Sequence, residues 1–273
     1  MNIAQALAHA KTLGLEHLEG QTLLLHALGR DLHDRAWLVS HDLDEPSLDT
    51  LQAFNTLVQR RLRQEPLAYL TGSQDFHGLT LRVDQRVLVP RPDTETLVEW
   101  AISLELEKAK VLDLGTGSGA IALALQHAQP QWHMTAVDAS ADALLVASGN
   151  AQALSLAVNF VHGNWFAALQ GRFDLIVSNP PYIAEGDPHL PALHSEPRQA
   201  LVSGVDGLDD IRHIIEQAPH HLNAGAWLLL EHGFDQASAV QDLLRQTGFS
   251  QVQSRVDLAG IKRCSGGQWP EVK

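Results

Sequence analysis

Two kinds of hydrophobic pattern divide the chain. Up to about residue 72 the apolar residues recur at helical spacing, and the clearest helical stretches are residues 2–10 and 21–28. A third helix is expected after Ser47, a residue type that caps helix N-termini, and Pro66 is expected to end it. One stripe of this helix is predicted to consist of Leu48, Leu51, Val58 and Leu62. The segment 1–72 is therefore predicted to be a small all-helical domain.

Between residues 73 and 90 the pattern changes from helical to alternating. Residues 76–83 and 86–89 alternate as in two short strands, and Asp84-Gln85 is expected to form the turn between them. We therefore predict a β-hairpin linker over residues 73–90.

From residue 91 onward the predicted strands and helices alternate, which is typical of a parallel sheet covered on both faces. Short apolar runs that predict buried strands lie at residues 111–114, 133–137, 173–178 and 226–231. Helices are expected at residues 93–100, 208–218 and 236–246. The predicted fold class is α/β, with a doubly wound domain over residues 91–273 behind the helical one.

The composition indicates how the fold is stabilised and in which cellular compartment the protein is expected. The 273 residues are 45% hydrophobic, enough for a sizeable core. Cys264 is the single cysteine, so no internal disulfide forms, which fits a reducing cytoplasm. We expect no signal peptide, because residues 1–5 show no charged region followed by an apolar core. We expect no membrane span, because no apolar run approaches about 18 residues.

Net charge bears on the partner. Only 19 basic residues stand against 32 acidic ones, a formal net charge of −13. An enzyme of duplex DNA has to neutralise several phosphates with lysine and arginine. The balance therefore argues against direct nucleic-acid binding. A solvated helix face is expected at Arg60, Arg61 and Arg63, and a local basic patch is the alternative.

The most informative motif is Asn179-Pro180-Pro181-Tyr182, directly after the predicted strand 173–178. The carboxyl end of a central strand is where open α/β sheets bind ligands. A planar amide or aromatic amine is a weak nucleophile, and two acceptors on its N–H groups favour release of its lone pair. The Asn179 side-chain oxygen and the Pro180 carbonyl are the predicted acceptors, and Tyr182 offers a flat face. A proline-rich loop without chemistry is the alternative.

A site for the electrophile is predicted upstream, at a glycine-rich turn between a strand and a helix. Gly115, Gly117 and Gly119 allow the backbone to approach a ligand closely. The dinucleotide fingerprint requires its third glycine at position 120, which is Ala. With an acid just before it, the turn is more typical of an S-adenosylmethionine site, where the helix N-terminus faces the cofactor's carboxylate.

Asp138 is the predicted ribose ligand. It follows the apolar run 133–137, about 20 residues past the glycines, where an acid at the end of the next strand receives ribose hydroxyls. The alternative is a helix N-cap before residues 139–142. Both interpretations place Asp138 at a strand-to-helix turn.

Several segments together resemble the N5-glutamine methyltransferases of peptide chain release factors, nearly from end to end. These segments are residues 66–72, 89–95, 111–122, 179–183, 196–201, 204–209 and 257–260. The resemblance implies a seven-stranded Rossmann-like methyltransferase domain behind a helical domain that helps to grip the substrate. It implies as partner a class I release factor, modified at the glutamine of its Gly-Gly-Gln motif. We expect a monomer without metal.

The resemblance also implies site residues. The implied contacts to S-adenosylmethionine are Gly115, Thr116, Gly117, Ser118, Gly119, Asp138, Trp165 and Asn179. The implied catalytic residues are Asn179, Pro180 and Tyr182, and the substrate contacts are these three with Pro181. Without the family, Trp165 would be read as an ordinary core residue. Asn164 departs from the aspartate common in the family, which puts the adenine contact at that position in doubt.

Other functions are weighed against this one. A DNA adenine-N6 methyltransferase uses the same Asn-Pro-Pro-Tyr logic, but the net charge and the lack of a large target-recognition region oppose it. A non-enzymatic binding protein would not need motifs for both cofactor and acceptor. A nicotinamide-dependent oxidoreductase fails at Ala120. Gly266-Gly267-Gln268 repeats the tripeptide that the family modifies, and a chance C-terminal turn is expected there.

Overall fold

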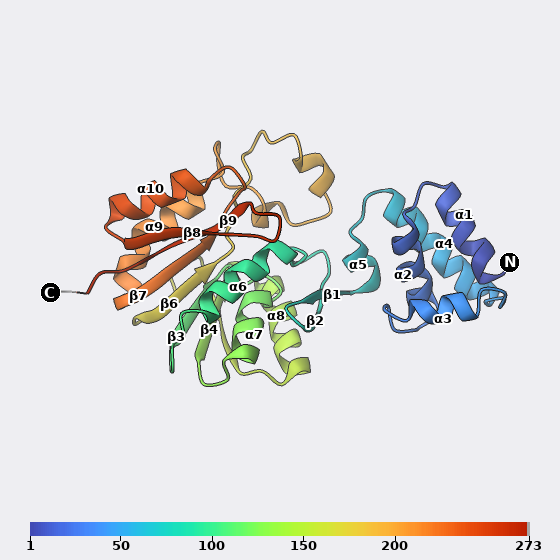
Figure 1. Ribbon diagram of the computed structural model, residues 1–273, viewed down its shortest axis with the longest axis horizontal. Coiled ribbons are helices and arrows are strands. Elements are labelled where there is room, and N and C mark those ends of the chain that lie inside the picture. Colours follow the sequence, from blue (N-terminus) through green and yellow to red (C-terminus); the bar gives the residue numbers. More distant parts are fainter. Residues whose placement is uncertain (272–273) are drawn as a thin grey trace. The chain divides into compact units, whose positions relative to one another are not determined.

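The computed structural model describes residues 1–271, which form two compact units that divide after Ser73 (Figure 1). The first unit is helical, as predicted. Its helices are α1 (Ile3–Thr12), α2 (His17–Ala27), α3 (Arg35–Ser40), α4 (Leu48–Leu62) and α5 (Leu67–Thr71). This unit has its own hydrophobic core, which includes Ile3, Leu24 and Phe54.

Helix α4 begins where the sequence predicted. The Ser47 side chain caps it by accepting from the Thr50 backbone N–H, at 3.1 Å. The predicted stripe is only partly right. Val58 is buried beside Phe54, but Leu48, at the first position of the helix, is exposed.

The hairpin forms earlier in the chain than predicted. Its strands are β1 (Ser73–Phe76) and β2 (Leu79–Arg82). The turn is at His77 and Gly78, with φ of 46° and 77°, the left-handed pair that two-residue hairpin turns require. The predicted strand over 86–89 is wrong, because the Val89 N–H bonds to the Glu196 carboxylate instead of a neighbouring strand.

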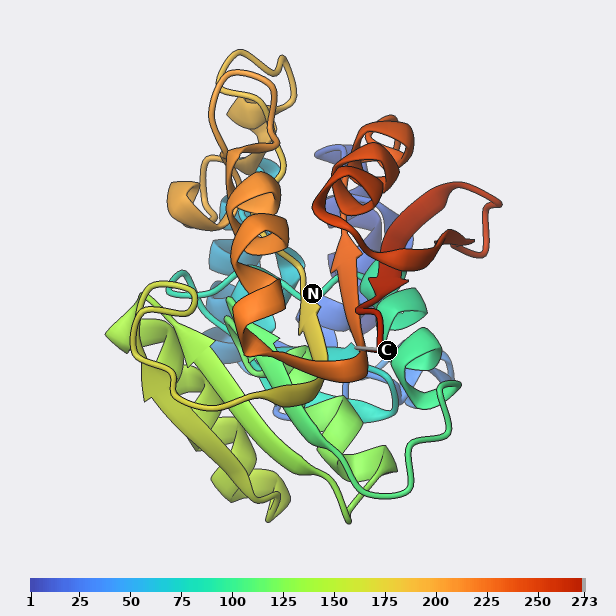
Figure 2. The ribbon, with the colours of Figure 1, turned by 90° about the vertical axis from the view of Figure 1, so that its left-hand side faces the viewer.

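A seven-stranded sheet forms the centre of the second unit, with the order β5-β4-β3-β6-β7-β9-β8. Figure 2 shows these strands side by side in a twisted sheet, from the green β3 and β4 to the red β8 and β9. All pairs are parallel except those of β9, which runs antiparallel to both neighbours. The strands are β3 (Lys110–Leu114), β4 (His133–Asp138), β5 (Val158–His162), β6 (Phe173–Ser178), β7 (Leu222–Glu231), β8 (Ser250–Val256) and β9 (Lys262–Gln268).

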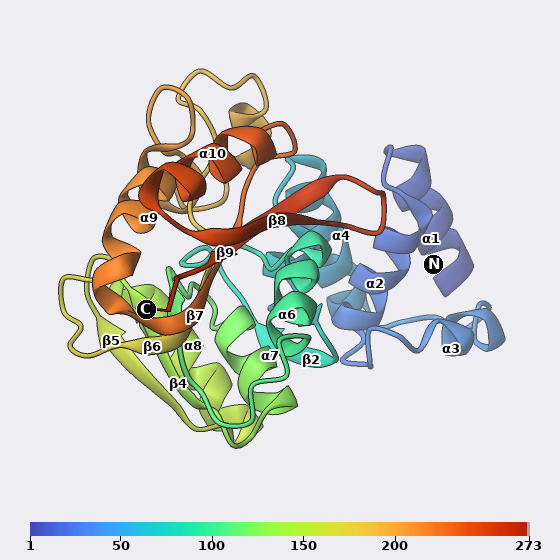
Figure 3. The same ribbon diagram turned by 60° about the vertical axis from the view of Figure 1, so that its left-hand side comes forward.

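Helices cover both faces of this sheet (Figure 3). Strand residues alternate between two cores, so that Val111 faces one and Leu112 the other. The first core packs α6 (Glu95–Ile102), α7 (Ala120–Ala128) and α8 (Ala141–Leu154). The second packs α9 (Asp209–His221) and α10 (Ala237–Thr247). The predicted doubly wound α/β fold is confirmed.

The C-terminal tripeptide is not a turn. Gly266, Gly267 and Gln268 lie in β9, between β7 and β8. A Cβ atom on Gly266 would lie 2.6 Å from the Leu228 carbonyl oxygen, so glycine is required there by the packing of the sheet. Within residues 1–271 no helix is both long and apolar enough to span a bilayer.

Candidate active site

The site is built at the carboxyl ends of three adjacent strands. β3 lies between β4 and β6 in the sheet. After β3 the chain adds β4 and β5 on one side, and it then crosses over to add β6 and β7 on the other side. Gly115 follows β3, Asp138 ends β4, and Asn179 follows β6. This is the switch point at which open α/β sheets bind ligands, so the fold brings the predicted residues together.

The glycine-rich loop turns sharply between β3 and α7. Gly115, Gly117 and Gly119 have φ of 72°, 55° and 85°, a region that suits glycine. The N–H groups of Gly115 and Thr116 both donate to the Val137 carbonyl, at 2.9 and 3.0 Å. The loop is therefore tied to the end of β4, next to Asp138.

Two of the predicted loop residues lie beneath the turn. The Thr116 hydroxyl donates to Asp113 Oδ2 at 2.6 Å, and both side chains are buried. Burial raises the pKa of Asp113 to about 7. The buried Ser118 offers its carbonyl to the Asn150 side chain at 2.9 Å. The Thr116 side chain and the Ser118 carbonyl thus tie the loop to residues behind it.

Asp138 braces the same loop. Its Oδ2 accepts from the Gly117 N–H and its Oδ1 from the Ser140 N–H, each at 2.8 Å. Ser140, whose side chain accepts from the Ala143 N–H, is the N-cap of α8. The alternative that Asp138 itself caps this helix is therefore wrong.

A pocket of about 250 Å³ opens above this loop, and we name it the Asp138 pocket. The glycine loop, the end of β4 and the motif after β6 all contribute to it. Among its lining residues are Gly115, Gly117, Asp138, Ser140, Asn164, Trp165, Asn179, Pro181 and Asp210. Thr116, Ser118 and Gly119 are not among those that line it.

Trp165 forms one wall of the Asp138 pocket. Its backbone is left-handed, with φ of 49°, and its indole Nε1 donates to Asp210 Oδ1 at 3.2 Å. A Cβ atom on Gly115 would lie 3.4 Å from the indole ring, so the glycine lets the ring lie against the loop. Trp165 is thus a half-buried pocket residue, unlike an ordinary core tryptophan. Asp210 was not predicted.

A second pocket of about 130 Å³ adjoins the motif, and we name it the Tyr182 pocket. Its lining is mostly apolar and consists of Leu88, Arg91, Asn179, Tyr182, Ile183, Leu193, Ala200 and Leu201. Asn179 lines both this pocket and the Asp138 pocket. One side chain therefore reaches two ligand-sized spaces.

Tyr182 and Asn179 are held from behind by buried polar groups. The Tyr182 hydroxyl donates to Glu231 Oε1 at 3.2 Å, and Asn179 Nδ2 donates to Thr94 Oγ1 at 3.2 Å. Burial, with the Glu231 carboxylate beside it, raises the pKa of Tyr182, which therefore stays protonated. Pro180 is buried and lines neither pocket, whereas Pro181 lines the Asp138 pocket.

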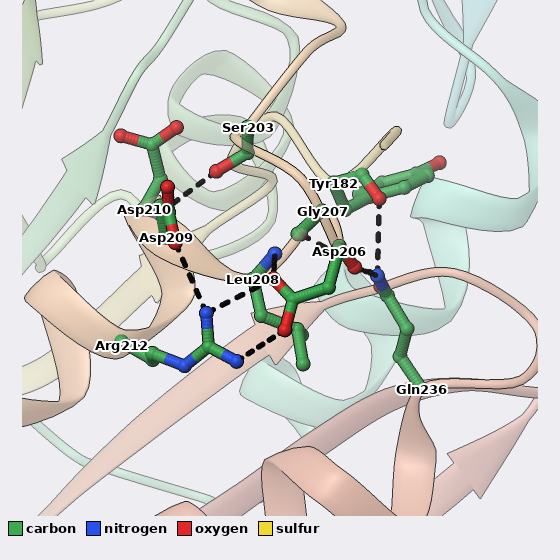
Figure 4. A network of polar contacts seen from close by, with 9 residues as sticks. All are labelled: Tyr182, Ser203, Asp206, Gly207, Leu208, Asp209, Asp210, Arg212 and Gln236. Carbon is green, nitrogen blue, oxygen red and sulfur yellow. Dashed lines mark hydrogen bonds and ion pairs between the residues drawn. The ribbon is translucent and has the colours of Figure 1, made fainter. Parts of the chain in front are cut away.

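The loop after the motif is tied back to it (Figure 4). The Gln236 side-chain amide donates to the Tyr182 carbonyl at 3.1 Å and to the Asp206 carbonyl at 3.3 Å. Arg212 on α9 bridges Asp206 of this loop and Asp209 at the start of the helix. A network of polar contacts thus fixes the backbone of the motif.

Glu196 ties together two segments that contribute residues to the pockets. It is buried, accepts from the Val89 N–H at 3.1 Å and pairs with Arg91. Both contacts span more than 100 residues of sequence, so no local pattern predicts them. They hold the segment before α6 against the loop that follows the Asn179–Tyr182 motif.

Comparisons with known proteins agree with this geometry. Residues 2–72 match the family model "PrmC N-terminal domain", and residues 93–206 match "Methyltransferase small domain". A release factor glutamine methyltransferase of Bordetella pertussis is 50% identical over 262 residues, 93% of this chain and 95% of the relative. The chain belongs to the release factor glutamine methyltransferases.

Further relatives of this family cover the chain as fully. The release factor glutamine methyltransferase of Pseudomonas aeruginosa is 47% identical over 257 residues, 92% of each chain. A crystal structure of a methyltransferase from Pyrococcus furiosus superposes with a TM-score of 0.54 at 20% identity, over 71% of this chain and 90% of that one. The last likeness shows the fold alone, which is the fold expected of a release factor glutamine methyltransferase.

Proposed function

We propose that the protein transfers a methyl group from S-adenosylmethionine to N5 of the glutamine in the Gly-Gly-Gln motif of class I release factors, and so modulates translation termination. The observation that carries this proposal is the place of Asn179, which lines two adjoining pockets. Methyl transfer requires the methyl donor and the accepting nitrogen to be held next to each other, and a residue shared by two adjoining pockets can contact both.

The Asp138 pocket fits the methyl donor by the chemistry of its lining. Each Asp138 oxygen accepts one backbone N–H and keeps lone-pair capacity for a ribose hydroxyl. The Trp165 indole offers a flat face for the adenine, and Gly115 and Gly117 let the backbone approach the amino-acid end. When bound, S-adenosylmethionine supplies an electrophilic methyl group on its sulfonium.

The Tyr182 pocket receives the glutamine side chain. Asn179 Oδ1 accepts one N–H of the substrate amide. The other N–H is assigned to the Pro180 carbonyl, although Pro180 is buried and lines neither pocket in this structure. Tyr182 packs against the amide plane, so these residues would orient the nitrogen toward the Asp138 pocket. Bound S-adenosylmethionine would supply the methyl group and leave as S-adenosylhomocysteine, and the surplus proton would pass from the nitrogen to water. Positioning supplies most of the rate.

A protein substrate is proposed because of the net charge of the chain and its sequence similarity to release factor glutamine methyltransferases. A formal net charge of −13 does not suit duplex DNA, and relatives at 47 to 50% identity are named for release factors. We further propose that residues 1–72 grip the release factor. We also propose that the enzyme acts in the cytoplasm as a monomer. One chain supplies the lining of both pockets, so the site needs no second copy to complete it.

The test uses labelled S-adenosylmethionine and a class I release factor made in a strain lacking this methylation. Tandem mass spectrometry is expected to find one methyl group on the glutamine of Gly-Gly-Gln. The control is a release factor with that glutamine changed to alanine, which should take up no label. Label on a duplex oligonucleotide, with none on the release factor, would show DNA adenine to be the substrate.

A further inference from the structure

The catalytic asparagine has a buried partner that no motif assigns. Thr94, 4% exposed, lies at the end of the 3-10 helix η1 (Pro92–Thr94), and Asn179 follows β6, 85 residues later in the chain. Asn179 Nδ2 donates to Thr94 Oγ1 at 3.2 Å. Among the described residues no donor contacts Asn179 Oδ1.

This contact decides which end of the amide faces the pocket. An asparagine side chain carries a donor and an acceptor of nearly the same shape, and only its neighbours choose between the two orientations. With Nδ2 bound to Thr94, Oδ1 is the free atom at the junction of the pockets. An acceptor at that point binds the N–H of a substrate amide, whereas a donor there would repel it.

Glu231 is a buried carboxylate near Thr94. It lies at the end of β7, where Oε1 accepts from the Tyr182 hydroxyl and Oε2 has no hydrogen-bond partner among the described residues. The Thr94 hydroxyl, like that of Tyr182, favours the charged carboxylate. A Thr94 O–H turned toward this unpartnered carboxylate oxygen would leave the Thr94 oxygen lone pairs for Asn179.

We propose that Thr94, oriented by Glu231, is a positioning residue that sets Asn179 with its carbonyl oxygen toward the substrate amide. This inference rests on the proposed function and adds the residues that give Asn179 its direction. Thr94 touches neither substrate nor cofactor, so its effect is on kcat through Asn179. Buried hydrogen bonds of this kind specify one arrangement where water would permit several.

The test compares Thr94→Val, which keeps the shape and removes the hydroxyl, with Thr94→Ser, which keeps the hydroxyl. For Thr94→Val, kcat on the release factor is expected to fall about tenfold, the effect of one hydrogen bond. The KM for the release factor and the Kd for S-adenosylhomocysteine should stay within about twofold, and Thr94→Ser should recover most of the rate.

A second readout does not depend on turnover. In protein labelled with ¹⁵N-asparagine, the Asn179 side-chain NH₂ is expected to shift and to exchange faster with solvent in Thr94→Val than in wild type. The matched control is Thr247→Val, which removes a hydroxyl contact to the Leu243 carbonyl on α10 and lies in neither pocket. It should change neither the rate nor the Asn179 signals.

The pH profile tests the role of Glu231. Burial raises the pKa of Glu231 to about 7, with Asp93, Arg263, Tyr182 and the Cys264 thiol as its titratable or charged neighbours. Ionised Glu231 orients the Thr94 hydroxyl and the protonated form does not. Wild-type kcat is therefore expected to rise with pH through about 7, and Glu231→Gln should abolish that rise.

The outcomes separate the two proposals. Wild-type transfer to the release factor, with unchanged kcat and Asn179 signals in Thr94→Val, overturns the positioning role alone. A loss in Thr94→Val that serine does not restore, or that comes with weaker S-adenosylhomocysteine binding, assigns Thr94 a structural role and also overturns it. Absence of transfer by the wild type refutes the proposed function, and this inference with it.

Discussion

Asn179 and Asp138 line the same pocket, but their substitution by alanine is expected to change different kinetic and binding constants. Asn179→Ala is expected to lower kcat by on the order of 10², because one preorganised polar contact to the reacting group is lost. Asp138→Ala should instead raise the Kd for S-adenosylhomocysteine, since both carboxylate oxygens brace the glycine loop and the α8 turn. Calorimetry and single-turnover kinetics separate the two effects. An Asn179→Ala enzyme with wild-type turnover would falsify the assigned role.

At the residue scale, the sequence predicted the residues that lie in local motifs and missed those that act across the fold. The turn glycines, Asp138 and Asn179 are recognisable because each follows a predicted strand. Thr94, Asp210 and Glu231 gain their roles from partners 85, 45 and 49 residues away. Threonine or a carboxylate at such positions has no spacing of its own, so only the fold identifies it.

Among the elements, the loop between the catalytic motif and α9 depends on one glycine. Gly207 has φ of 75°, and a Cβ atom there would lie 2.2 Å from the Tyr182 carbonyl oxygen. Gly207→Ala is therefore expected to displace Tyr182, to destabilise the protein by about 1 to 3 kcal/mol and to lower kcat. Thermal unfolding and steady-state kinetics measure both effects.

The matched control for this loop is Gly186→Ala. Gly186 lies in the same long connection after the motif, and a Cβ atom there would meet nothing within 4 Å. Its melting temperature and kcat should equal those of the wild type. If Gly207→Ala behaves in the same way, the carbonyl of Tyr182 does not need the fixed position that Gln236 and Gly207 give it.

Elements with strong patterns were predicted well, and elements set by turn chemistry or tertiary packing were not. The strands β3, β4 and β6 are apolar runs buried on both faces, which a sequence shows directly. The hairpin was misplaced because the left-handed pair at His77 and Gly78 sets the turn and was not recognised. β9 was missed because its glycines, read as a turn, fit closely against β7.

At the scale of the whole molecule, the two compact units are expected to have different functions. The helical unit has a core of its own, and the residues that line the two pockets all lie between Arg86 and Asp210. We therefore expect cofactor binding and methyl transfer to need only the second unit, whereas the proposed grip on a release factor needs the first. The negative charge of the chain also leaves protein contacts, and not phosphate contacts, to supply the affinity.

Removal of residues 1–72 tests this division. The truncated enzyme keeps the hairpin that begins at Ser73 and both pockets, so its Kd for S-adenosylhomocysteine is expected to match that of the full chain. Its kcat/KM on an intact release factor should fall at least about tenfold, because the contacts of the helical unit are lost. On a short Gly-Gly-Gln peptide, which cannot reach a second contact, the two enzymes should turn over at the same rate. Equal kcat/KM on the intact release factor would mean that the methyltransferase unit alone recognises its substrate.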